Sequence, residues 1–180
     1  MKTINAFVDT STVNRILEID TGEVKNALYE EDRLYLFKIM GYAEKGIVQL
    51  IVNPSVKREI EKTSDSHKKK RLLTLFAQFH FTPYNTTIFP FTFPAYFITE
   101  VEKGALEELR KKISGFRKDQ KIFIDAVSNA QVKVLLTTDR KHLAKKEIYD
   151  SLKSKSLDKK ILVFTPKKFY EYIQTDGLAS

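Results

Sequence analysis

The alternation of short apolar segments with amphipathic segments is the feature that most restricts how this chain can fold. Apolar runs without polar alternation are typical of strands buried on both faces, and strands separated by helices favour βαβ units in a parallel sheet. With 180 residues, the chain is long enough for one domain with a substantial core. We therefore predict one α/β domain over residues 1–180, with a central parallel sheet flanked by helices. The predicted strands are residues 4–8, 47–52, 134–138 and 161–165.

Helical periodicity, N-cap residues and prolines at first helical positions predict the helices between these strands. Gly46 is expected to end the second of them. By its composition, the Lys- and Ser-rich segment 150–160 is expected to be an exposed loop. Three of the predicted helices begin after Asp9, at Pro54 and at Pro166. The others cover residues 33–45, 68–79, 99–113, 119–130 and, as a short helix after Asp139, 140–146.

Residues 79–97 stand apart, since they hold eight of the 21 Phe and Tyr residues and three of the five prolines. Proline interruption excludes a regular helix there. We predict an insertion or arm around residues 79–98, part of which, where Phe89, Phe91 and Phe93 alternate, is an edge strand or an extended arm. The aromatic side chains either cover an apolar face of the domain or stack on bases or contact a protein partner.

Charge is unevenly distributed along the chain. Residues 1–66 carry 9 Lys and Arg against 11 Asp and Glu, whereas residues 67–180 carry 22 against 12, which together give the net +8. Basic clusters of this kind favour a polyanionic partner, although a solvated lysine-rich surface has the same composition. The absence of Cys excludes disulfides, thiolate zinc sites and a cysteine nucleophile. No apolar run is long enough for a membrane span or a signal peptide, so we expect a cytoplasmic protein without membrane contact.

Four carboxylates occupy related places in this predicted topology. Asp9 and Asp139 directly follow strands, Glu59 lies on the helix after the second strand, and Asp119 starts the helix that leads to the third. The carboxyl ends of parallel strands share one edge, where ligands bind. Carboxylates that converge there need a cation, and hard oxygen ligands suit Mg²⁺ or Mn²⁺. Taken singly, each acid is better explained as a helix cap or a solvated side chain, but their joint placement in this topology favours a shared site.

The blocks INAFVDTST, VNPSVKREIEK, DQKIFIDAVSNAQVKVLLTTDRKHL and ILVFTPKKFYEYI make the chain resemble the PIN domain family. These metal-dependent nucleases include the toxins of the virulence-associated protein C family. Both ends of the chain and residues 47–62 carry the resemblance, and about 63–115 has no counterpart. The resemblance implies a Rossmann-related three-layer sandwich and a Mg²⁺- or Mn²⁺-dependent endoribonuclease. Its acidic site would consist of Asp9, Glu59, Asp119 and Asp139.

The same resemblance assigns two hydroxyl residues to the site, Ser11 after the first Asp and Thr138 before the last. Its third acid is ambiguous, because the interval from Asp119 to Asp139 is longer than is usual in the family and Asp125 lies within it. Six residues on a helix separate Asp119 from Asp125, so the two point in different directions. For His142, a surface or packing role is favoured over contact with the substrate, since the proposed metal site does not need it.

RNA is the substrate that the resemblance implies. The candidate phosphate contacts are Arg58, Lys121, Arg140 and Lys141, each of which is also explained as part of a solvated helix face. An antitoxin or other protein partner and a homodimer are further expectations from the toxin-type relatives. The main alternative is a non-catalytic PIN-like domain that binds RNA or a protein. Other phosphate chemistries are less consistent with the sequence: no G-x-x-x-x-G-K-S/T motif is present, and Ser11 occupies the position where a haloacid-dehalogenase-type phosphatase needs a second Asp.

Overall fold

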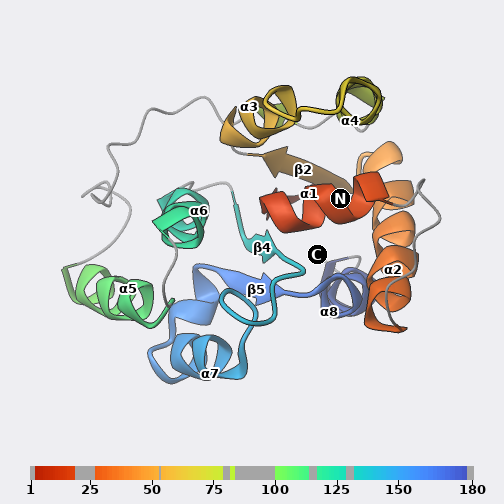
Figure 1. Ribbon diagram of the computed structural model, residues 1–180. Coiled ribbons are helices and arrows are strands. Elements are labelled where there is room, and N and C mark those ends of the chain that lie inside the picture. Colours follow the sequence, from red (N-terminus) through yellow and green to blue (C-terminus); the bar gives the residue numbers. More distant parts are fainter. Residues whose placement is uncertain are drawn as a thin grey trace.

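Five parallel strands form the central sheet of the computed structural model (Figure 1). Their order is β3-β2-β1-β4-β5, so the chain builds outward from β1 first on one side and then on the other. The switch in direction lies between β1 and β4. The structure describes residues 3–18, 27–52, 54–78, 82–83, 100–113, 117–128 and 132–177. The strands are β1 (Ile4–Val8), β2 (Val48–Val52), β3 (Thr82–Pro83), β4 (Val134–Leu136) and β5 (Leu162–Phe164).

The sheet is buried on both faces, which explains why its strands read as continuous apolar runs. Successive residues of a strand point to opposite faces. Thus Ala6 and Val8 of β1 pack into one core, and Phe7 packs into the other. The neighbouring strand β4 divides in the same way, with Leu135 on the Phe7 side.

Helices cover both faces (Figure 1). Residues of α1, α2, α3, α4 and α8 join the core that contains Val8, and residues of α6 and α7 join the core that contains Phe7. The molecule therefore has an α/β domain of three layers. The helices are α1 (Thr10–Glu18), α2 (Ala27–Glu44), α3 (Pro54–Glu61), α4 (Ser66–Gln78), α5 (Glu100–Lys112), α6 (Arg117–Ser128), α7 (Lys146–Ser154) and α8 (Pro166–Tyr172), with the 3-10 turn η1 (Leu157–Lys159) and the π-helical turn η2 (Ile173–Gly177).

Most predicted elements are confirmed, with differences at their ends. The second helix starts at Ala27 rather than residue 33 and ends before Gly46, which has φ +70° and donates its N–H to the Ala43 carbonyl at 3.0 Å. Glycine adopts this left-handed conformation without strain, so it ends the helix as expected. The Phe37 side chain of this helix is 50% exposed.

The prediction of an exposed loop over residues 150–160 is wrong. Helix α7 and the turn η1 occupy this segment, and Leu152 and Leu157 are both buried. Composition misled the prediction, because the many Lys and Ser residues form the outer face. The spacing of Ile148 and Leu152, four residues apart, is the helical signal that was overlooked.

The short helix predicted over residues 140–146 is also not observed. Residues 140–143 form turns, and α7 begins only at Lys146. Hydrogen bonds from the backbone N–H groups of Lys141 and His142 to the Asp139 carboxylate hold these turns instead of a helical ladder. Side-chain acceptors of this kind compete with helix formation.

The aromatic segment lies outside the described residues except for Thr82 and Pro83. These two residues form β3, which pairs with Ile51 and Val52 at the edge of the sheet. The edge strand expected where Phe89, Phe91 and Phe93 alternate lies outside the described residues, and the roles of the aromatic side chains stay predictions. Among the helices that the structure describes, none has the length and apolar character needed to cross a membrane.

Candidate functional site

The carboxyl ends of β1 and β4 lie side by side and start the loops that carry the candidate residues. Asp9 follows β1 and donates its backbone N–H to the carbonyl of Leu136, the last residue of β4, at 3.2 Å. Thr137, Thr138 and Asp139 follow that strand directly. This is the point where the strand order switches direction, and open parallel sheets bind ligands at such points.

Asp9 is buried at this edge, with its side chain held by three donors. The backbone N–H of Thr12 donates to Oδ1 at 2.8 Å, and the hydroxyls of Ser11 and Thr137 donate to Oδ2 at 2.7 and 2.6 Å. Burial raises the pKa of Asp9, and these hydrogen bonds oppose the rise only in part. Asp9 therefore acts as a buried acceptor that connects its own loop to the loop after β4.

Hydroxyl groups complete this connection. The Ser11 and Thr138 hydroxyls are 2.9 Å apart, and the backbone N–H of Thr138 donates to the Thr12 hydroxyl at 2.9 Å. Networks of this kind make a site rigid because each group fixes the orientation of the next. Ser11 and Thr138, both predicted for the site, thus join the two loops directly.

Asp139 organises the turn that follows β4. Its Oδ1 accepts hydrogen bonds from the backbone N–H groups of Lys141 at 2.9 Å and His142 at 3.0 Å. Its own backbone N–H donates to the Thr137 hydroxyl at 3.0 Å, and that hydroxyl in turn donates to Asp9. A single hydroxyl therefore links the backbone of Asp139 to the carboxylate of Asp9.

The other oxygen of Asp139 belongs to a group of three potential metal ligands. The Nδ1 atom of His142 lies 2.8 Å from Oδ2 of Asp139 and 3.8 Å from Oδ2 of Asp119. The ligand atoms of the three residues all lie within 4.8 Å of one another, and their side chains are between 19% and 26% exposed. They are thus partly shielded and still within reach of solvent.

The 2.8 Å separation is close to that between neighbouring ligands of a small divalent cation, whereas the 3.8 Å separation is wider. Bonds of about 2.1 Å place neighbouring ligands about 3.0 Å apart around an octahedral ion and about 3.4 Å apart around a tetrahedral one. Two carboxylates are suited to Mg²⁺ or Mn²⁺, and an imidazole shifts the preference toward Mn²⁺ and later transition metals. By donor type, Asp119, Asp139 and His142 are therefore described residues that could hold such an ion.

The four predicted acids occupy different places in relation to this group. Asp119 and Asp139 are brought together, and Asp9 lies beside them through Thr137 without being one of the three. Glu59 lies on α3, but its side chain is outside the part of the structure that is described. Asp125, the alternative third acid, is buried on α6 and does not join the group either.

Sequence reasoning missed His142. A surface or packing role was expected, whereas the ring nitrogen contacts Asp139. The available signal was the interval of three residues after Asp139, because an Asp that starts a turn brings the third following residue back toward its own side chain.

The four residues predicted to contact phosphate differ in their exposure and in their partners. Arg140 donates two hydrogen bonds, at 2.7 and 2.8 Å, to the carboxylate of Asp32, which is 2% exposed. The Asp32 carboxylate raises the pKa of Arg140. This bidentate pair fastens the Asp139 turn to α2, which gives Arg140 a structural partner. Arg58 and Lys141 are exposed, and the Lys121 side chain lies outside the described residues.

No protein-family model matches this chain, and curated proteins include no significant match to it.

Proposed function

We propose that the protein is a metal-dependent endoribonuclease with a PIN-like fold that uses Mg²⁺ or Mn²⁺ to hydrolyse RNA phosphodiester bonds. The observation that carries this proposal is the convergence of Asp119, Asp139 and His142 at the carboxyl edge of a parallel sheet. Two further features support it. The resemblance to PIN domains points to the same edge, and residues 67–180 carry a net charge of +10 that favours a polyanionic substrate.

In this proposal, Asp119 and Asp139 would hold the metal, which would supply a bound water of lowered pKa and stabilise charge on the attacked phosphoryl group. Backbone N–H groups of Lys141 and His142 fix one oxygen of Asp139, and the other oxygen lies 2.8 Å from the His142 ring nitrogen. His142 adds a nitrogen donor to these two carboxylates. The resemblance further implies products with a 5′-phosphate and a 3′-hydroxyl.

Asp9 would serve the site chiefly by positioning. Its carboxylate already accepts three hydrogen bonds, and Thr137 transmits its position to the backbone of Asp139. Ser11 and Thr138 hold the same two loops together. The resemblance assigns Glu59 to the acidic set as well, and in this proposal it completes the set from α3.

The second candidate is a non-catalytic PIN-like domain that binds RNA or a protein. Engagement of Asp9 by three donors favours it, because fewer carboxylate oxygens then remain for a metal. Exposure of Leu34 and Phe37, 54% and 50%, on one face of α2 favours a protein contact such as an antitoxin or a second copy of this chain.

The two candidates are separated by a Mn²⁺ titration and a cleavage assay on end-labelled single-stranded RNA. In the nuclease, the double substitution Asp119→Asn with Asp139→Asn is expected to lower Mn²⁺ affinity at least tenfold and to abolish metal-dependent cleavage. Replacing the exposed Asp150 by Asn, which removes one carboxylate from α7, should change neither. Undiminished cleavage in the double variant, with a native circular dichroism spectrum, would refute the proposal.

A further inference from the structure

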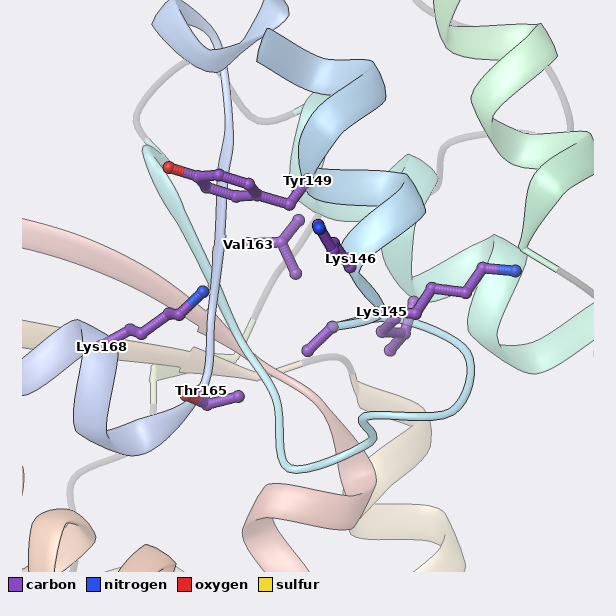
Figure 2. Close-up of a pocket in the computed structure, with 8 residues that line it drawn as sticks. Lys145, Lys146, Tyr149, Val163, Thr165 and Lys168 are labelled. Atoms are coloured by element: carbon purple, nitrogen blue, oxygen red, sulfur yellow. The ribbon is translucent and has the colours of Figure 1, made fainter.

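A pocket of about 270 Å³ lies beside the edge strand β5, between α7 and α8 (Figure 2). Lys146 and Tyr149 reach it from α7, and Lys168 reaches it from α8. In Figure 2 the amino group of Lys168 is turned toward the Tyr149 ring, whereas the amino group of Lys145 extends away from it. The pocket therefore has an apolar floor with two cations at its rim.

These two cations have no carboxylate partner among the described residues. The nearby Glu147 lies 3.4 Å from Lys145 and so serves the lysine that points away. Lys168 instead places its amino group 4.9 Å from the centroid of the Tyr149 ring. Lysine ammonium groups without an internal counterion attract anions, and they bind phosphates as point charges.

The pocket is continuous with the turn that carries Asp139. Leu143 and Ala144 form its wall, and their backbone N–H groups both donate to the Asp139 carbonyl, at 3.2 and 2.8 Å. Thr165 lies at the carboxyl end of β5, next to that of β4, where the Thr137 N–H donates to the Phe164 carbonyl at 3.0 Å. An extended RNA strand bound across Asp139 can therefore reach the pocket while it stays along this edge of the sheet.

We propose that this pocket is a subsite for single-stranded RNA, in which Lys146 and Lys168 bind a backbone phosphate next to the Asp119, Asp139 and His142 group. This inference deepens the proposed function and rests on it. The volume is slightly below the usual range of small-molecule sites, so it suits one phosphate with its sugar rather than a folded partner. Tyr149, 38% exposed, offers the aromatic surface that single-strand binding sites combine with cations.

The test is RNA binding measured without metal, by fluorescence anisotropy of a labelled single-stranded oligonucleotide in EDTA. Replacing both Lys146 and Lys168 by Ala is expected to weaken binding by about tenfold or more and to reduce the slope of log K against log salt by about 0.7, the contribution of one neutralised phosphate of a single strand. Replacing both by Arg should keep the slope. The control variant, Lys45→Ala with Lys153→Ala, removes the same charge from exposed lysines outside the pocket and should change the slope little.

The outcomes separate the pocket from the chemistry. Equal losses in the pocket variant and the control variant would overturn the subsite, and wild-type cleavage with Mn²⁺ would still support the nuclease. Pocket-dependent RNA binding without any Mn²⁺-dependent cleavage would support the subsite and refute the nuclease. A nucleoside 5′-monophosphate that competes as strongly as the oligonucleotide would overturn the assignment to a nucleic-acid strand.

Discussion

Replacing Arg140 by Ala is expected to destabilise the protein by about 2–3 kcal/mol. Asp32 on α2 is 2% exposed, and both of its carboxylate oxygens accept hydrogen bonds from the Arg140 guanidinium. Removing one partner of a buried ion pair costs about 3–5 kcal/mol, because the other charge stays buried without compensation. The Arg140 side chain is 33% exposed, so water screens the charge that remains on Asp32. The expected cost is therefore at or below the lower end of this range.

Urea denaturation followed by circular dichroism measures this effect. With a slope of about 2 kcal/mol per molar urea, the midpoint should fall by about 1 M or slightly more. Lys141→Ala is the matched control, since it removes an exposed cation from the adjacent position and should cost no more than about 0.5 kcal/mol. Asp32→Asn in the Arg140→Ala background should recover part of the loss, because the uncompensated charge is then absent. A cost for Arg140→Ala that matches the Lys141→Ala control would refute the reasoning.

The same variant tests whether the ion pair positions the candidate site. Arg140 directly follows Asp139, so loss of the bond to α2 frees the turn that aims this carboxylate. Mn²⁺ affinity should fall about tenfold, as expected for residues that orient metal ligands. Arg140→Lys should restore stability only in part, since an ammonium group does not reproduce the two parallel hydrogen bonds. Unchanged Mn²⁺ affinity in folded Arg140→Ala would show that the pair is purely structural.

Two further predictions concern the buried network at Asp9. Because burial raises the pKa of Asp9, its contribution to stability is largest at acid pH and is lost as pH rises through the folded-state pKa. Asp9→Asn should remove this loss, and the same slope of Tm against pH in both proteins would contradict it. Thr137→Val keeps the side-chain shape but removes the hydroxyl between Asp9 and Asp139, and it should lower the free energy of unfolding in urea by about 1–3 kcal/mol. The control, Thr74→Val at an exposed position of α4, should cost no more than about 0.5 kcal/mol. Similar values for the two variants would contradict the role of Thr137.

The sheet was predictable because its burial on both faces leaves a local record in the sequence. Apolar runs such as residues 47–52 are short, continuous and bounded by turn residues, and they correspond to observed strands. Where the only signal of a buried face is the spacing of apolar residues along a helix, the surrounding polar composition concealed it. In α7, the interval between Ile148 and Leu152 marks the buried face, and the Lys and Ser residues around it only describe the surface.

Parts of the site were predictable for a topological reason. Acids that follow two adjacent parallel strands must share an edge, and this places Asp9 beside the loop of Asp139. The detailed partners were not predictable, because they come from distant parts of the chain. Asp32 is 108 residues from Arg140, and no local pattern identifies it as the acid that would bind this arginine.

The net charge of the sequence does not distinguish cations that are paired within the protein from cations that are available to bind RNA. The sum of +8 counts Arg140 and Lys167 fully, although each is hydrogen-bonded to a carboxylate of α2. A cation that already neutralises an internal acid replaces little of the counterion atmosphere of RNA, so it adds little to the salt dependence of binding. Lysines such as Lys146 and Lys168, which lack such a partner among the described residues and lie beside the candidate site, should contribute most. If RNA binds at this edge of the sheet, its affinity should therefore follow the charge of this pocket more closely than the net charge of the protein.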